Sequence, residues 1–478
     1  MKVKWTSRIL AISLCMGLLF VVPTQSLPAT PPRPNIIIIL TDDMGYGDLS
    51  AYGHPSIRTP NLDRMAAQGQ KWTNFYAQAP VCSPSRAALL TGRLPIRSGM
   101  YGVAQPTTPK VLMDNAAQGL PVEEITLAEA LKARGYGTGI IGKWHLGHLP
   151  QFLPMRQGFD EWYGLPYSHD MRMTVPRDKG LQTDAYYHPK PEYWNVPLMR
   201  NDQVIEQPAD HRTLTKRYTE EAVRFITSHK KEPFFLYLAH SMPHIPLATS
   251  PEFVGHSAAG VYGDVIEELD WSVGQILEAL QKLRLDKRTL VVFTSDNGPW
   301  LPFRTHGGSA GPLREGKGTT WEGGMRVPTI FWWPGLIRPG EVLGIGSNMD
   351  LFVTAIKLAG GEPPTDRIID GVDLRGPLMG TTESPRHVLF YYWNNELRAI
   401  RKDAFKMHFI TSGAYGLGSP RTEHTPPLLF NLAEDPGERY DITDKYPKIV
   451  ADILKEAEAH RRTVSPTKPL FDELLPAR

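Results

Sequence analysis

The chain is poor in cysteine, with two residues in 478, Cys15 and Cys82. A secreted domain that relied on disulfides would carry an even set of cysteines in its mature part. Cys15 falls in the apolar start of the chain, so removal of that start leaves Cys82 alone. A lone thiol cannot form a disulfide within the chain. It therefore either packs as a small apolar group or takes part in chemistry.

An excess of charge of one sign is also missing. The net charge of +2 gives no electrostatic reason to expect nucleic acid or a membrane surface as a partner. No apolar run approaches the length of a membrane span, so we expect no stable membrane insertion. After the apolar start, the chain has no Asn-x-Ser/Thr acceptor. These absences fit a bacterial periplasmic or secreted enzyme better than a glycosylated lysosomal one.

Residues 1–26 have the pattern of an export signal. Lys2, Lys4 and Arg8 form a basic start, residues 9–22 an apolar core, and residues 24–26 a cleavage site. We therefore predict an exported protein whose signal peptide is removed.

Continuous apolar runs alternate with helical patterns along the next part of the chain. The runs at 35–40 and 290–294 show no polar alternation, which is typical of strands buried on both faces of a parallel sheet. Shorter runs at 139–141 and 234–238 alternate with helical patterns at 126–134 and 215–228. The order predicts an α/β fold with a large, mostly parallel sheet sandwiched by helices. Ligands of such sheets bind beyond the carboxyl ends of the strands.

Two segments depart from this order. Residues 165–211 are rich in proline, aromatic and charged residues, which predicts a long irregular loop. From about residue 380, short strand patterns at 388–393, 397–401 and 405–410 precede a helical pattern at 446–461. We predict a catalytic domain over 34–380 and a smaller C-terminal α+β subdomain over 381–478 that carries a short antiparallel sheet.

Cys82 lies at the predicted start of a helix. The segment reads Cys82-Ser83-Pro84-Ser85-Arg86 and continues to Leu90-Thr91-Gly92-Arg93. Pro84 suits the first helical position, Ser83 is a candidate cap, and Gly92 is a candidate stop. The sulfur would then lie near the positive end of a helix, where an anion or a nucleophile is favoured.

Polar side chains follow the two longest apolar runs. Asp42 and Asp43 end the first run, and Asp296 and Asn297 end the second. If the two strands are neighbours, three carboxylates and an amide oxygen converge. Such hard oxygen ligands suit Ca²⁺ or Mg²⁺ rather than zinc. Either pair taken alone would be read as turn or cap residues.

Basic and imidazole side chains follow the other runs. Lys143 and His145 lie two residues apart, so on an extended segment they would face the same way. His240 and His244 lie among prolines that favour a loop. Lys317 lies between two glycines, which let the backbone approach a ligand closely. Each of these residues taken alone would be read as a surface or structural residue.

Together these motifs resemble the formylglycine-dependent (type I) sulfatase family, in particular arylsulfatase A-like members of the alkaline-phosphatase superfamily. The resemblance implies that a maturation enzyme oxidises Cys82 to formylglycine (3-oxoalanine), whose hydrate attacks sulfur. It implies one Ca²⁺ held by Asp42, Asp43, Asp296, Asn297 and residue 82. The expected activity is hydrolysis of a sulfate monoester of a small aryl compound or a carbohydrate.

The resemblance also implies the roles of the remaining site residues. Arg86 would hold the hydrate, and Lys143 and Lys317 would bind the sulfate oxygens. His145 would contact the hydrate with support from Ser168, and His244 would lie near the leaving oxygen. Beyond the family pattern, we expect Trp300, Arg304 and His306 to shape the substrate entrance.

Two other functions stay open on the sequence. A phosphoester or phosphonate monoester hydrolase of the same superfamily could use the same aldehyde, although the sequence has no second dense His/Asp cluster for another metal. A non-catalytic protein that binds sulfated glycans would be marked by loss of Cys82, Lys143, His244 or Lys317, and all four are present.

Overall fold

The computed structural model describes residues 1, 33–105, 108–177, 179–180 and 183–476. The predicted signal peptide lies almost entirely outside these residues and stays a prediction. Among the helices in the described part of the chain, none is both long and apolar enough to cross a membrane.

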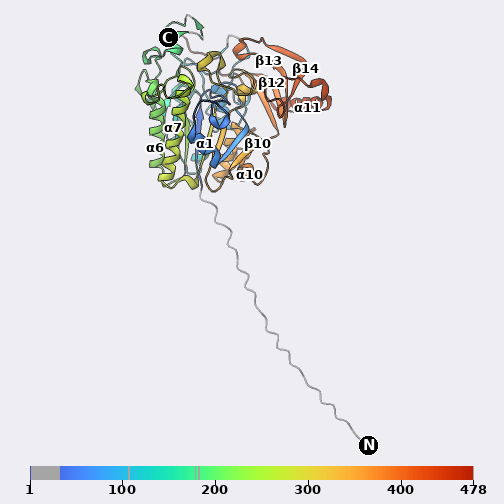
Figure 1. The fold of residues 1–478 in the computed structure, drawn as a ribbon, viewed down its shortest axis with the longest axis horizontal. Helices are drawn as coiled ribbons and strands as arrows, with labels where there is room; N and C mark the ends of the chain where they lie inside the picture. The colour runs from blue at the N-terminus through green and yellow to red at the C-terminus, as the bar shows by residue number, and fades with distance from the viewer. Residues whose placement is uncertain (2–32, 106–107, 178, 181–182, 477–478) are drawn as a thin grey trace. The chain divides into compact units, whose positions relative to one another are not determined.

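A ten-stranded sheet forms the centre of the fold (Figure 1). Its strands are β1 (Asn35–Thr41), β2 (Gln70–Tyr76), β3 (Gly137–Lys143), β4 (Glu161–Leu165), β5 (Leu198–Arg200), β6 (Gln203–Glu206), β7 (Phe234–Ala239), β8 (Thr289–Ser295), β9 (Thr329–Trp332) and β10 (Gly340–Ser347). The spatial order is β10-β2-β9-β8-β1-β7-β3-β4-β5-β6. The central strands from β8 to β4 are parallel, which confirms the predicted mostly parallel sheet.

The two longest apolar runs are neighbouring strands. β1 pairs with β8 in parallel, in register from Asn35 opposite Thr289 to Thr41 opposite Ser295. Every residue of both strands is buried, as expected for a strand covered on both faces. Because the strands end in register, the polar residues that follow them emerge at one place on the edge of the sheet.

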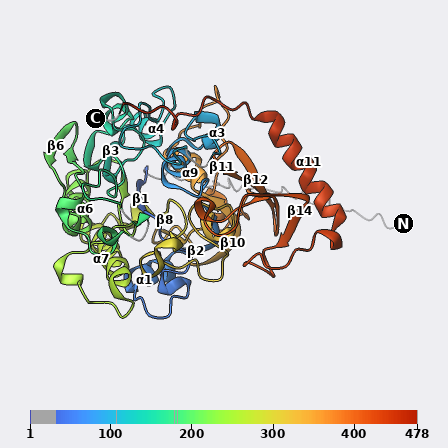
Figure 2. The same ribbon diagram turned by 90° about the horizontal axis from the view of Figure 1, so that it is seen from above.

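Helices cover both faces of the sheet (Figure 2). The helices are α1 (Pro60–Gln68), α2 (Cys82–Thr91), α3 (Pro95–Ser98), α4 (Leu127–Lys132), α5 (Asp184–Tyr187), α6 (Leu214–Ser228), α7 (Gly260–Lys282), α8 (Glu322–Met325), α9 (Asn348–Leu358), α10 (Arg375–Leu378) and α11 (Pro447–Thr463). One face packs against α1, α6 and α7, and the other packs against α2, α4 and α9. The helix that begins at Cys82 is therefore built into the core.

A separate antiparallel sheet lies in the C-terminal region, coloured orange to red in Figure 1. Its strands are β11 (Val388–Trp393), β12 (Glu396–Lys402), β13 (Phe405–Thr411) and β14 (Thr422–Asn431). Helix α11 packs against this sheet through Ile453 and Ala457. This confirms the predicted fold class. Arg33–Arg478 form one compact unit, and the boundary between residues 380 and 381 stays a prediction.

The prediction of an irregular loop over 165–211 was wrong in part. Residues 198–206 form the hairpin β5–β6, which pairs with β4 and extends the sheet. The sequence did not predict this hairpin, because β6 is exposed along most of its length and shows no apolar alternation.

Candidate active site

The residues that follow β1 and β8 meet, as the parallel pairing requires. The backbone N–H of Asp43 donates to Asp296 Oδ1 at 3.1 Å, and Asn297 Nδ2 donates to Asp43 Oδ1 at 2.7 Å. Asp42, Asp43, Asp296 and Asn297 are each at most 2% exposed. Three carboxylates and an amide therefore share one buried position at the carboxyl edge of the sheet.

Helix α2 carries Cys82 to this position. The helix begins at Cys82 and ends at Thr91, and the next residue, Gly92, caps it with a φ of 68°, in the left-handed region that favours glycine. Ser83 does not cap the helix, contrary to our expectation. Its Oγ instead accepts a hydrogen bond from the backbone N–H of Leu112 at 3.1 Å, so it anchors a neighbouring loop.

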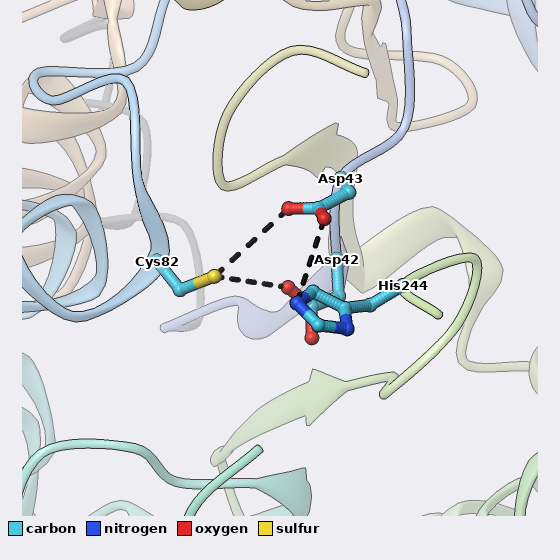
Figure 3. Close-up of side chains that lie close together, drawn as sticks. All are labelled: Asp42, Asp43, Cys82 and His244. Carbon is cyan, nitrogen blue, oxygen red and sulfur yellow. Dashed lines mark hydrogen bonds and ion pairs between the residues drawn. The ribbon is translucent and has the colours of Figure 1, made fainter. Parts of the chain in front are cut away.

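The Cys82 thiol faces the acidic group (Figure 3). Its Sγ lies 3.3 Å from Asp42 Oδ1, 3.9 Å from Asp43 Oδ1 and 3.6 Å from Lys317 Nζ. Asp42, Asp43, Cys82 and His244 each offer one ligand atom, and these atoms lie within 4.8 Å of one another. Among the described residues, this is the one group of three or more such side chains arranged to hold a metal ion.

Arg86 lies one helical turn after Cys82 and is fully buried. Its Nε donates to Asp296 Oδ2 at 2.9 Å, and one terminal nitrogen donates to the backbone carbonyl of Lys143 at 3.0 Å. The other terminal nitrogen lies 3.6 Å from Asp42 Oδ1. Arg86 thus joins α2, β3 and the two acidic strand ends.

Two buried lysines neutralise the acidic pair after β1. Lys143 Nζ lies 2.5 Å from Asp42 Oδ2, and Lys317 Nζ lies 2.7 Å from Asp43 Oδ2. The Lys317 loop is fixed by its backbone, because Lys317 N–H donates to the Pro299 carbonyl and Gly318 N–H to the Pro80 carbonyl, each at 2.8 Å. Ser168 does not support His145 as we expected. Its Oγ accepts from Lys143 Nζ at 3.2 Å.

The candidate histidines separate into different positions. β3 ends at Lys143, and His145 adopts a left-handed φ of 58°, so the two side chains do not lie on one extended segment as we expected. His145 Nε2 pairs with the Leu112 carbonyl at 2.9 Å, while its buried Nδ1 has no partner. His244 Nε2 lies 3.6 Å from Asp43 Oδ2. His240 Nε2 pairs with Ser272 Oγ at 3.3 Å instead.

Burial and charge shift the titration of this group. Burial raises the pKa of Asp43 to about 7, and Asp42 and Asp296 add repulsion against the opposing effect of Lys317. Burial would also raise the pKa of Asp42, but Lys143 and other nearby cations hold that pKa well below its usual range. Burial, and then Asp42, raise the pKa of the Cys82 thiol well above its ordinary value, so the unmodified thiol is protonated here.

The residues fit a divalent cation with a preference for oxygen ligands. Asn297 Oδ1 is buried and has no hydrogen-bond partner, an arrangement that costs free energy unless a cation or a donor faces it. Beside it lie three carboxylates whose mutual repulsion a cation would cancel. Carboxylate and amide oxygens are the ligands of Ca²⁺ and Mg²⁺.

Several residues at the site adopt strained backbone conformations. Asp43, His145, Glu315 and Tyr415 have φ values between 53° and 67°. This region is costly for residues other than glycine, and such residues concentrate at functional sites. These strained residues lie at or next to the buried carboxylates and lysines of the site.

Sequence reasoning missed the contribution of the C-terminal sheet. Lys406 on β13 forms ion pairs with Glu322 and Glu438 at 2.9 and 3.0 Å and donates to the Thr320 carbonyl at 2.9 Å. Thr320 and Glu322 closely follow Lys317, so the network fixes the lysine loop. Tyr415 packs on Gly318, beside Lys317. No local sequence pattern could have joined residues about a hundred positions apart.

Comparison with known proteins identifies the family. The sulfatase family model matches residues 34–361, and a model of the C-terminal region of aryl-sulfatase matches residues 384–477. The chain belongs to the sulfatase family. It is 42% identical to arylsulfatase A of Bos taurus, over 95% of this chain and 90% of the relative. It is also 42% identical to N-acetylgalactosamine-6-sulfatase of Mus musculus, over 96% of this chain and 92% of the relative.

A solved structure shares the fold of this sulfatase. Ps i-CgsB in complex with k-i-k-neocarrahexaose is 29% identical, with a TM-score of 0.76 over 91% of this chain and 94% of that chain. Together these comparisons make the chain an enzyme, a sulfatase, and they confirm the resemblance to arylsulfatase A-like members inferred from the Cys82 motif.

Proposed function

We propose that this sulfatase hydrolyses carbohydrate or aryl sulfate monoesters through a formylglycine made from Cys82 and one Ca²⁺ ion. The observation that carries the proposal is the position of Cys82 at the start of a buried helix. There its sulfur faces two carboxylates and the Lys317 ammonium at 3.3 to 3.9 Å. Asp42, Asp43, Asp296 and Asn297 would hold the ion, together with the modified residue 82.

The formylglycine hydrate and the Ca²⁺ ion would each supply part of the chemistry. A hydrated aldehyde at position 82 would supply an oxygen nucleophile, and its second hydroxyl would lose a proton to a base as the aldehyde re-forms and sulfate leaves. The cation would supply positive charge to the sulfate oxygens. A maturation enzyme must form the aldehyde before the first turnover.

The side chains of this chain position and neutralise the substrate. Lys143 and Lys317 would bind the sulfate oxygens. Lys317 Nζ lies 3.6 Å from Cys82 Sγ, and Lys143 Nζ pairs with Asp42, whose other carboxylate oxygen lies 3.3 Å from the same sulfur. Preorganised charge of this kind stabilises the negative charge that develops during transfer. Arg86 holds the acidic residues and the end of β3 in place. Ser168 orients Lys143 by accepting a hydrogen bond from it.

Two histidines would transfer protons in this mechanism. His244, next to Lys317 and Asp43, would deliver a proton to the departing alcohol or phenol oxygen. The buried Nδ1 of His145 has no partner, which leaves it free to accept a proton from the hydroxyl at position 82. These roles follow the family resemblance.

The relatives favour carbohydrate as the sulfated alcohol. One relative is named an N-acetylgalactosamine-6-sulfatase, and the solved neighbour holds a neocarrahexaose. The predicted export signal would place the enzyme in the periplasm or outside the cell, where sulfated polysaccharides occur. We therefore propose a sulfated saccharide as the natural substrate and an aryl sulfate as a convenient one.

The proposal is tested by the mass of the Cys82 peptide and by turnover of an aryl sulfate. Protein made with a maturation enzyme should carry oxoalanine at position 82 and turn over the ester. Cys82→Ala, and wild-type chain from a host without that enzyme, should be folded but inactive. Exhaustive chelation should abolish turnover, and Ca²⁺ should restore it. Unchanged turnover by Cys82→Ala would exclude the mechanism, and faster turnover of an aryl phosphate would favour a phosphoester hydrolase.

A further inference from the structure

A row of aromatic side chains leads outward from the catalytic lysine. Lys317 Nζ lies 4.2 Å from the ring centroid of Trp300, whose ring is also 5.3 Å from that of His244. The Tyr415 ring follows, 5.7 Å from Trp300, and the Trp393 ring lies 5.9 Å beyond Tyr415. The row begins beside Lys317 and His244, the latter proposed to protonate the leaving oxygen, and runs to Trp393 in the C-terminal sheet.

Tyr415 is the exposed member of this row. It is 37% exposed, whereas Trp393 is 6% exposed. Its φ of 53° lies in the left-handed region, which is costly for tyrosine. A Cβ on Gly318 would lie 2.8 Å from Tyr415 Cε2, so the ring packs directly on the backbone next to Lys317. The ring is therefore held at the active site, in a residue that keeps part of its surface exposed.

The exposed surface of Tyr415 lies on the side of the site where the leaving alcohol is expected. Lys317 and Cys82 mark where the sulfate binds, and His244 marks where the ester oxygen departs. Trp300 contacts both Lys317 and His244, so the alcohol attached to that oxygen extends along Trp300 and towards Tyr415. Aromatic rings offer large, rigid apolar surfaces at low entropic cost. A pyranose ring presents a flat apolar face of C–H groups to such a surface.

We propose that Tyr415 is a substrate-positioning residue whose ring stacks on the sugar that carries the scissile sulfate, beside Trp300. The inference rests on the proposed sulfatase function and adds a contact that the C-terminal region makes with the substrate. In this proposal, Tyr415 contacts the leaving alcohol and not the sulfate. Its replacement should therefore weaken binding of the sulfated sugar without weakening binding of inorganic sulfate.

The test compares four forms of the full chain, each with position 82 matured: wild type, Tyr415→Ala, Tyr415→Phe and Tyr440→Ala. Tyr440 is the matched control, because it is a tyrosine of the same C-terminal region that is 69% exposed. The substrate is the best of a panel containing N-acetylgalactosamine 6-sulfate, sulfated galactose and sulfated glucosamine. Inorganic sulfate is measured as a competitive inhibitor, because it occupies only the sulfate position.

Tyr415→Ala should raise KM for the sulfated sugar about tenfold, equivalent to about 1.4 kcal/mol. Its kcat and the inhibition constant of inorganic sulfate should stay within about threefold of wild type. Tyr415→Phe, which keeps the ring, and Tyr440→Ala should both resemble wild type.

Other outcomes overturn the inference. A tenfold weaker inhibition by inorganic sulfate in Tyr415→Ala would show that the residue acts through Lys317. A defect in Tyr415→Phe equal to that in Tyr415→Ala would assign the effect to the hydroxyl and not to stacking. Turnover of an aryl sulfate without turnover of any sugar in the panel would refute the inference and leave the sulfatase function standing. No turnover of either substrate class would refute the proposed function itself.

Discussion

Replacement of Lys406 by methionine should destabilise the chain because it leaves two buried carboxylates without their shared cation. Lys406, Glu322 and Glu438 have no exposed side-chain surface, and the ammonium lies 2.9 and 3.0 Å from the two carboxylates. Removing one partner from a buried ion pair costs about 3–5 kcal/mol. Tyr76 still donates to Glu322 at 2.6 Å, and His408 still pairs with Glu438 at 2.7 Å. We therefore expect the free energy of unfolding, measured in urea at neutral pH, to fall by about 3 kcal/mol, the lower end of that range.

The stability lost in Lys406→Met should become smaller as the pH falls. Burial would raise the pKa of Glu322, but Lys406 and nearby arginines lower it from 4.5 to about 2. A depressed carboxyl pKa stabilises the folded chain above pH 4.5, and this contribution is lost as the pH falls from 4.5 towards 2. The difference between wild type and Lys406→Met should therefore shrink over that range.

A control in the same sheet makes the experiment decisive. Lys402 on β12 pairs with Asp452, but these side chains are 28% and 58% exposed. Exposed pairs contribute about 0–1 kcal/mol, so Lys402→Met should cost no more than that. Because Lys406 also binds the Thr320 carbonyl beside the Lys317 loop, kcat/KM for an aryl sulfate should fall in Lys406→Met alone. Equal stability losses in the two variants would refute the reasoning.

Two further predictions concern other parts of the chain. Gly318→Ala should lower kcat/KM at least tenfold, because Gly318 has a φ of 84° and its new Cβ would meet Tyr415 at 2.8 Å. Gly335→Ala has the same backbone strain (φ 83°) but open space, and equal kinetic losses in both variants would contradict this explanation. Burial and nearby arginines lower the pKa of His460 from 6.5 to about 4, so its contribution to stability is lost as the pH falls from 6.5 to 4. The stability difference between wild type and His460→Gln should shrink by up to about 3 kcal/mol over that range, and parallel pH profiles would exclude it.

The central sheet could be predicted because its strands carry a strong local pattern. The run Ile36 to Leu40 and the run Leu290 to Phe293 can only be buried on both faces, and two such strands with helices between them form a parallel pair. The β5–β6 hairpin could not be predicted, because it lies at the edge of the sheet, where exposed residues carry no alternation. The convergence of the acidic residues depended on β1 and β8 being neighbours, which the structure confirms.

The finer geometry of the site depends on loops. For the loop residues, the sequence predicted which side chains lie at the site but not which atoms they contact. Lys143 and Ser168 were both expected at the site, but their mutual hydrogen bond was not. His145 was expected to share a direction with Lys143, and a left-handed turn after β3 sends it towards Leu112 instead. A positive φ is uncommon for residues other than glycine, so no local pattern predicted this turn.

The C-terminal sheet shows why a division into a catalytic and an accessory part is incomplete. Its strand patterns predicted a separate layer, and separate layers suggest independent roles. Yet Lys406 fixes the loop that carries Lys317, and Tyr415 packs on the next residue of that loop. In the proposed mechanism, the charged group at the edge of the main sheet would bind the sulfate, which is common to every sulfate ester. If the alcohol stacks against Tyr415 beside Trp300 as proposed, changes in the C-terminal region would alter which sulfate ester is cleaved without altering how it is cleaved.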